Sequence, residues 1–163
     1  MFVLATALSA EQIKNPAMWQ TFARIAVEKE YEVEAKEYFR NYANLAWAMA
    51  KIGLSDEPFW TFIERLFATE LERTKLAEQS REFKSSVLVT ICFALKDCKA
   101  HNFSDDFWNE LNSQLRLFLQ QRIEQAARLH SKGDTLDETE SLSMIRTAVE
   151  SNTRLDDSLL NML

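Results

Sequence analysis

The sequence predicts an all-α protein, and more specifically an α-solenoid of stacked helical hairpins. Glycine and proline occur only twice each in 163 residues, far below the usage that the turns of a many-stranded protein require. Hydrophobic residues make up 47% of the chain, with eleven Phe and four Trp, so the composition suits packed helices and not a disordered segment. An internal repeat then indicates which kind of helical fold to expect.

The repeat relates the segment from Phe2 to Trp19 to the segment from Ala43 to Trp60, 41 residues later. Aligned without a gap, the two segments pair Leu4 with Leu45, Ala5 with Ala46, Ala7 with Ala48, Leu8 with Met49, Asn15 with Asp56, Met18 with Phe59 and Trp19 with Trp60. Self-similarity at roughly 20 to 50 residues is typical of stacked supersecondary units, none of which buries its apolar face alone. We therefore expect one helical-repeat domain, 1–163, of three to four units of about 41–50 residues, with approximate bounds 1–38, 39–79, 80–132 and 133–163.

The second unit provides the template for the others. A helix over about Phe39–Ile52 is apolar nearly all round, with large side chains on one side and alanines on the other, so it is expected to lie between neighbouring helices. Gly53 is expected to end it. Ser55 is the candidate N-cap of the next helix, ahead of an acidic first turn and Pro58. The apolar stripe of that helix is Phe59, Phe62, Ile63, Leu66, Phe67 and Leu71.

In the first unit, Asn15 and Pro16 are expected to begin the equivalent second helix, whose apolar stripe is Trp19, Phe22, Ile25 and Ala26. The residues from Phe2 onward align with the template's first helix. Two other interpretations remain for this stretch. Ser9 to Gln12 has the spacing of a capping box, and FVLATALSA resembles the core of a signal peptide, although no basic leader precedes it.

The third unit is expected to begin near Ser80, with Phe83, Val87, Leu88, Ile91, Cys92 and Leu95 as the stripe of its first helix. Its second helix is expected over about Asp105–Leu129, because Phe103 to Trp108 repeats the start of the template's second helix. A fourth unit is expected to open with the capping-box pair Thr135 and Glu138. Its second helix corresponds to LDDSLLNML at the end of the sequence.

Both ends of this stack are abrupt, whereas a solenoid normally finishes with a unit whose outer face is polar. The apolar residues Phe2, Val3, Leu4 and Leu8 begin the sequence, which ends inside the expected second helix of the fourth unit. We therefore expect the chain to be part of a longer protein or to be docked into an assembly whose subunits cover its ends.

Charge and cysteine content narrow the classes of partner. The net charge of −6 opposes binding to a phosphate backbone, so no DNA partner is expected, and only the near-neutral stretch from Glu64 to Lys132 would suit RNA. Cys92 and Cys98 point in different directions on one helix and cannot pair with each other, which fits a reducing compartment. No apolar run approaches the roughly 20 residues of a membrane span, so no membrane partner is expected.

The sequence offers no pattern of residues for catalysis, and we expect no enzyme, no cofactor and no metal. Cys98 and His101, with Cys92 nearby, lack a second pair of ligands for structural zinc. The acidic row of Glu30, Glu34 and Glu37 is more typical of a solvated helix face than of a cation site. Two glycines 80 residues apart cannot form a phosphate-binding loop.

The stretch YANLAWAMAKIGLSDEPFWTFI, Tyr42 to Ile63, resembles the repeat of the octotricopeptide and heptatricopeptide proteins and of the helical region of FAST kinase-like proteins. In those families a unit of the form L-A-W-A-x-A-K-L-G recurs, followed by a second helix containing Phe. LAWAMAKIG departs from it only conservatively. The first unit has Thr6 in place of the Trp and Ala10 in place of the Lys, and the third has Phe93 in place of the Trp. The resemblance implies an α-solenoid of an organelle, typically a mitochondrion or chloroplast, working in RNA processing, RNA stability or translation, and it does not imply catalysis.

These observations predict a non-catalytic scaffold or adaptor subunit of a large organellar complex. By resemblance the complex is mitochondrial, either a ribonucleoprotein such as a mitoribosome or a protein assembly. Other protein subunits are the expected partners, because interfaces use aromatic anchors while the charge sign opposes phosphate.

The alternative is direct binding of single-stranded RNA in organellar RNA processing or stability. The position of Lys51 corresponds to Ala10, Asp97 and Ser151 in the other units, so no basic ladder runs along the stack. Aromatic residues at helical spacing are also more often core than base-stacking residues. The residues predicted to contact a partner or RNA are Asn44, Trp47, Lys51, Arg81, Lys84, Phe93, Lys96 and Lys99.

Overall fold

The computed structural model describes residues 15–28, 36–76, 81–98, 103–130 and 139–163. They form the helices α2 (Pro16–Glu28), α3 (Lys36–Ile52), α4 (Glu57–Thr74), α5 (Arg81–Leu95), α6 (Asp105–His130) and α7 (Thr139–Ser151), and the 3-10 helix η2 (Asp157–Met162). The described residues contain no strand. The prediction of an all-α protein is confirmed. Every helix in this part of the chain is too short or too polar to cross a lipid bilayer.

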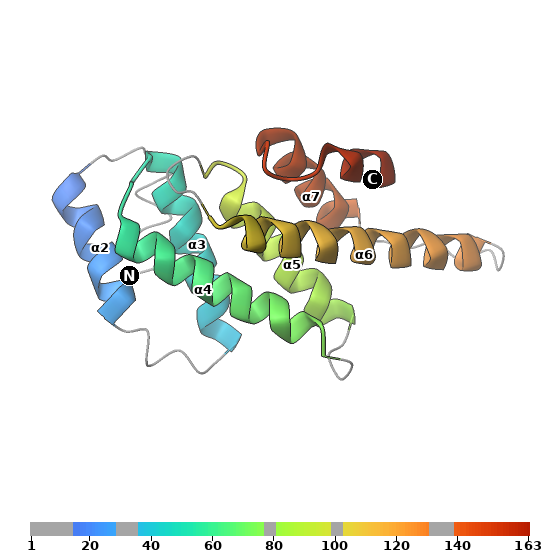
Figure 1. The fold of residues 1–163 in the computed structure, drawn as a ribbon, viewed down its shortest axis with the longest axis horizontal. Helices are drawn as coiled ribbons and strands as arrows, with labels where there is room; N and C mark the ends of the chain where they lie inside the picture. The colour runs from blue at the N-terminus through green and yellow to red at the C-terminus, as the bar shows by residue number, and fades with distance from the viewer. Residues whose placement is uncertain (1–14, 29–35, 77–80, 99–102, 131–138) are drawn as a thin grey trace.

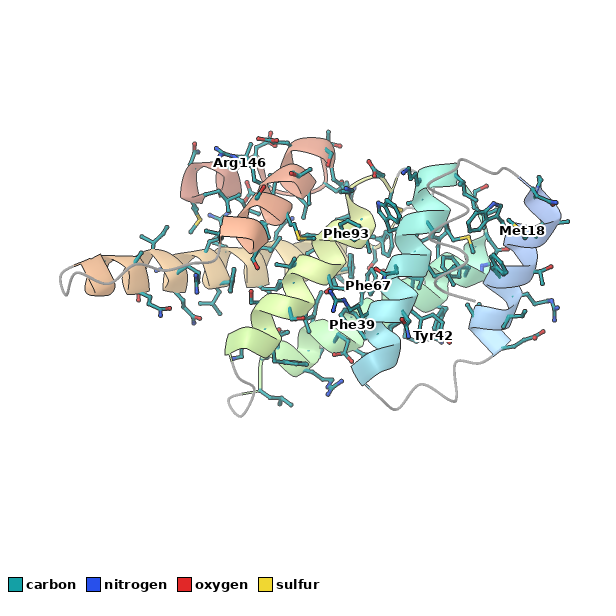
Figure 2. The ribbon with its side chains drawn as sticks, turned by 180° about the vertical axis from the view of Figure 1, so that it is seen from behind. Met18, Phe39, Tyr42, Phe67, Phe93 and Arg146 are labelled. Carbon is teal, nitrogen blue, oxygen red and sulfur yellow. The ribbon has the colours of Figure 1, made fainter. Side chains whose placement is uncertain are left out.

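The helices lie in two rows (Figure 1). The first row consists of α3, α5 and α7, in which α3 packs against α5 and α5 against α7. The second row consists of α2, α4, α6 and η2, each of which packs against the next. Sequential contacts also join α3 to α4, α5 to α6 and α7 to η2 across the two rows. Figure 2 views the molecule from the side of the first row, with α3, α5 and α7 next to one another.

The second-row helices begin with the same local structure. The side chains of Asn15, Asp56 and Ser104 each accept a hydrogen bond from the backbone N–H three residues later, at 3.3, 3.0 and 3.2 Å. A tryptophan follows four residues after each of these caps and is at most 5% exposed, and these tryptophans are Trp19, Trp60 and Trp108. The three tryptophans therefore occupy equivalent positions. Asp156 caps η2 through the N–H of Ser158 at 2.8 Å.

A second hydrogen bond recurs between consecutive second-row helices. The carboxylate of Glu64, eight residues after the α4 cap, accepts the backbone N–H of Ser104, the α6 cap, at 3.0 Å. Asn112, eight residues after the α6 cap, accepts the backbone N–H of Asp156, the η2 cap, at 2.9 Å. Helices α4 and α6 thus each hold the start of the next second-row helix. The corresponding position in α2 is Ala23, which has no polar side chain for this bond.

The turn between α3 and α4 follows from Gly53, as the sequence predicts. Its φ of 73° lies in the left-handed region, which glycine adopts without steric cost. The N–H of Gly53 donates to the carbonyl of Ala50 and that of Leu54 to the carbonyl of Met49, both at 3.0 Å, which is the Schellman pattern of a helix end. The indole N–H of Trp60 donates to the carbonyl of Leu54 at 2.8 Å and so fastens the start of α4 to this turn.

The assignment of Ser55 as the N-cap of α4 is wrong by one residue. Asp56 is the cap, with extended φ and ψ and a side chain that accepts the N–H of Phe59. The reason is the position of Pro58. An N-cap side chain accepts from the second or third helical residue, and a cap at Ser55 would make Pro58 the third residue, which has no N–H to donate.

Helix α3 is buried on nearly all sides, as its composition predicts. Ala43, Leu45, Ala46, Ala48 and Met49 have no exposed surface. Its N-terminal half makes edge-to-face ring contacts with α4, where Phe39 meets Phe67 and Tyr42 meets Phe62 (Figure 2). The hydroxyl of Tyr42 donates to the carbonyl of Ala26 at the end of α2, at 3.4 Å.

Of the remaining predictions, some are confirmed, one is corrected and some lie outside the described residues. Helix α6 matches the predicted range to within one residue, and the predicted stripes of α4 and α5 face the core. In α2, Trp19, Phe22 and Ala26 of the predicted stripe do so, whereas Ile25 is not part of the core cluster. The predicted second helix of the fourth unit is the short 3-10 helix η2. The buried amide of Asn152 joins the end of α7 to α5 by donating to the carbonyl of Leu95 at 3.0 Å. The predicted first helix from Phe2, the spacing at Ser9 to Gln12 and the pair Thr135 and Glu138 lie outside the described residues.

Substitution of Asp56 tests the corrected cap. We expect Asp56→Ala to lower the free energy of unfolding by about 1 kcal/mol, because the N–H of Phe59 loses its acceptor. Ser55→Ala is the matched control and should change it by no more than about 0.5 kcal/mol. Urea denaturation followed by circular dichroism measures both. A larger loss for Ser55→Ala than for Asp56→Ala would contradict this assignment.

The carboxylate of Asp156 predicts how stability depends on pH. Its bonds to Ser158, assisted by Arg116, hold the pKa below the usual 3.8. Because the folded-state pKa is lowered, the stabilisation is complete above pH 3.8 and is lost as pH falls through the folded-state pKa. We expect Asp156→Asn to destabilise the protein at pH 7, with a difference from the unaltered protein that shrinks towards pH 3.

Urea unfolding at a series of pH values measures this difference. Asp157→Asn is the control, because the neighbouring carboxylate makes none of these bonds in the described structure. A difference between the Asp156 variant and the unaltered protein that grew as pH fell would refute the role of Asp156.

Candidate functional site

The predicted contact residues Trp47 and Phe93 form a stacked pair across the first row. Trp47 comes from α3 and Phe93 from α5, with ring centroids 5.3 Å apart and an angle of 26° between the ring planes. This offset parallel arrangement is a favourable one for aromatic rings. Both side chains are half-buried. Trp47 packs against the core, and Phe93 covers it from the neighbouring helix, where Figure 2 shows it on the first-row side.

Two of the predicted lysines lie over this pair. The ammonium group of Lys51 is 4.9 Å from the centroid of the Trp47 ring, and that of Lys96 is 4.8 Å from the centroid of Phe93. Each lysine lies three or four residues after the ring that it contacts, Lys51 on α3 and Lys96 directly after the end of α5. We call these four residues the lysine-flanked stack, and each of its cation–π contacts is of the kind worth about 0.5–1 kcal/mol at an exposed site.

The two ammonium groups of the stack have no carboxylate partner. Within the described structure, neither Lys51 nor Lys96 takes part in an ion pair. Asp97 follows Lys96 directly but pairs with neither lysine. An anion approaching this surface would therefore meet two positive charges that are not already neutralised.

Helix α3 extends this surface along its axis. Arg40 and Asn44 precede Trp47 by seven and three residues, and Lys51 follows it by four. At 3.6 residues per turn these four side chains fall within about 60° of one another. Arg40 is exposed and Asn44 half-buried. Sequence reasoning named Asn44, Trp47 and Lys51 but missed Arg40, which the same spacing would have found.

The indole N–H of Trp47 is an exception among the buried polar atoms. It is inaccessible to solvent and has no hydrogen-bond acceptor in the described structure. A buried donor without an acceptor costs about 1–3 kcal/mol. Trp60 shows the contrast, because its N–H is bonded to a carbonyl. The described structure therefore leaves the indole N–H of Trp47 without a hydrogen bond.

The two rows differ in charge. The first-row helices carry six basic and four acidic residues, whereas the second-row helices carry six basic and ten acidic residues. Among these helices, the net negative charge therefore lies on the second row. The lysine-flanked stack lies on the first row, which is the more positive of the two rows.

The remaining predicted contact residues do not join the stack. Lys84 lies nine residues before Phe93 on α5, which is about 180° around the helix. It lines a separate cavity of about 360 Å³ between α4, α5 and α6. Arg81 begins α5, but its side chain lies outside the description, and so does Lys99. The eight predicted residues therefore do not form one continuous described surface.

The cavity beside Lys84 is lined by Thr74, Lys75, Lys84, Leu88, Gln114, Leu117, Phe118 and Gln121. Lys75 is bonded to Glu72 and Glu110, at 2.7 and 3.0 Å, and these bonds raise its pKa. Their carboxylates therefore offset the charge of Lys75, which leaves this cavity less suited to an anion than the stack.

The thiols give no sign of reactivity. Burial raises the pKa of Cys92 to about 12, so the thiolate that reacts as a nucleophile is scarce at neutral pH. Cys98 is half-buried and is not in a disulfide. The described side chains hold no group of three or more metal-binding residues, while His101 lies outside them.

Comparison with known proteins adds no assignment. No family model, curated protein or solved structure matches this chain.

Proposed function

We propose that this chain is an α-solenoid that serves as a non-catalytic scaffold or adaptor subunit of a large organellar complex. The observation that carries the proposal is the recurrence of the same bond between successive second-row helices, from Glu64 to Ser104 and from Asn112 to Asp156. Sequential contacts within both rows support it. Stacked helical hairpins form extended surfaces, which such proteins use to hold other macromolecules.

Protein partners are favoured by the character of the surface. Leu76, Leu117 and Ile123 are half-exposed large apolar side chains, and they lie on or beside the two longest second-row helices. Apolar and aromatic side chains form the centres of protein interfaces. The net charge of −6 also favours protein over nucleic acid.

The organelle and the type of complex rest on the sequence. LAWAMAKIG, Leu45 to Gly53, resembles the repeat of organellar helical-repeat proteins. On that resemblance we propose a mitochondrial ribonucleoprotein, such as a mitoribosome, or a mitochondrial protein assembly. The reduced cysteines are compatible with this.

Direct binding of single-stranded RNA is the second candidate. Its supporting observation is the lysine-flanked stack, since aromatic rings with neighbouring cations are the elements that hold single strands. Against it stands the position of Lys51 and Lys96 over the two rings, because a base stacking on those faces would have to displace a lysine. Affinity for single-stranded RNA that falls steeply with salt would establish this function.

Purification from the native source tests the scaffold proposal. We expect the tagged full-length chain, at its native expression level and in moderate salt, to elute in size-exclusion chromatography with a complex many times its mass of 18.9 kDa. Ribonuclease treatment separates the two candidates, because a protein-held subunit stays in the complex. Recovery as a free 18.9 kDa monomer would refute the scaffold proposal.

A further inference from the structure

The lysine-flanked stack has a feature that helical packing does not explain. Two ammonium groups stand over an aromatic pair without any carboxylate to neutralise them, in a chain whose acidic residues outnumber its basic ones by 25 to 19. Elsewhere in the described structure, Arg24, Lys75, Arg116 and Arg154 all have acidic partners. The lysines of the stack are therefore available to an anion from outside the chain.

We propose that this surface binds an extended acidic segment of a partner protein. The proposal rests on the scaffold function and names the chemistry of one of its contacts. The segment would cross from α3 to α5, with its carboxylates at Lys51 and Lys96 and, further along α3, at Arg40. The lysine-flanked stack and Arg40 together form this basic surface.

The geometry calls for more than one negative charge. Lys51 and Lys96 contact different rings, which come from different helices, so each lysine offers its own contact for a carboxylate. In an extended chain every second side chain points the same way, which spaces like residues about 7 Å apart. A segment with alternating acidic residues therefore offers carboxylates to both lysines, while the half-buried ring edges between them contact its intervening side chains.

An acidic protein segment fits better than RNA for two reasons. An ammonium group already lies over each ring, so a base would have to displace a lysine to stack there. Phosphate-backbone binding also draws on several cations in a row, and the described basic surface has only Arg40, Lys51 and Lys96. These three cations are enough to contact the carboxylates of a short acidic segment.

Fluorescence anisotropy with defined probes tests the inference. The probes are a fluorescein-labelled twelve-residue peptide of alternating glutamate and serine and a twelve-nucleotide oligoadenylate, each titrated with the full chain at low salt. We expect the peptide to bind more tightly than the oligoadenylate. The double variant K51E/K96E should weaken peptide binding by about tenfold or more, because two attractive contacts become repulsive.

The control is Lys84→Glu, which reverses one lysine charge on the opposite side of α5, half the change in K51E/K96E, and should change the peptide affinity less than about twofold. Circular dichroism and thermal unfolding verify that both variants fold. A second double variant, Lys51→Arg with Lys96→Arg, keeps both positive charges and should bind the peptide as the unaltered protein does. It keeps the test valid if the glutamate variant unfolds. Equal losses in K51E/K96E and K84E, no peptide binding, or tighter oligoadenylate binding that depends on Lys51 and Lys96 would each overturn the inference.

A negative result for the acidic-segment inference is distinguishable from a negative result for the scaffold function. If the chain elutes in a large complex but the peptide result is negative, only the acidic-segment inference is lost. If the chain is a free monomer and yet binds the peptide through Lys51 and Lys96, the scaffold function is lost and the basic surface remains a binding site.

Discussion

The arrangement of the helices depends on one recurring hydrogen bond. A side chain eight residues after one helix cap accepts the backbone N–H of the next cap, at Glu64 with Ser104 and at Asn112 with Asp156. Without this bond the N–H of the next cap would lack its acceptor, and the start of that helix would not be held against its predecessor. The spacing between the caps that this bond joins varies, from 48 residues between Asp56 and Ser104 to 52 between Ser104 and Asp156. The bond therefore keeps the second-row register while the loops and helices change length.

Packing between neighbouring helices explains the burial of α3 and the position of the candidate site. A helix as apolar as α3 is stable in water only when its neighbours cover it, and here α4 and α5 do so. Trp47 and Phe93 come from α3 and α5, so the lysine-flanked stack exists only where these two helices meet. In the proposed solenoid, binding and stability are therefore linked through the contact between those two helices.

Much of the fold could be predicted from the sequence because its determinants are local. The alignment of Asn15 with Asp56 and of Trp19 with Trp60 located the helix starts, and Gly53 marked a helix end that its positive φ explains. The cap at Asp56 was missed by one residue because Ser55 and Asp56 both suit a cap, and only the missing N–H of Pro58 separates them. The short 3-10 helix η2 was not foreseen, since its sequence repeats the helix-start pattern of longer helices.

The pairing of Trp47 with Phe93, and of each ring with a lysine, was beyond prediction because it depends on the register between α3 and α5. The separation of Lys84 from these residues follows from helix geometry and could have been anticipated.

Native-state hydrogen exchange tests the central claim most directly, which is that no hairpin is stable without its neighbours. If the claim holds, the backbone amides of α3, α4 and α5 exchange only through global unfolding, with a common free energy of opening equal to that from urea denaturation. Glu64→Ala should then lower that energy equally in all three helices. Exchange of α3 and α4 at a free energy different from that of α5, with Glu64→Ala affecting only one of them, would show independent hairpins and contradict the account.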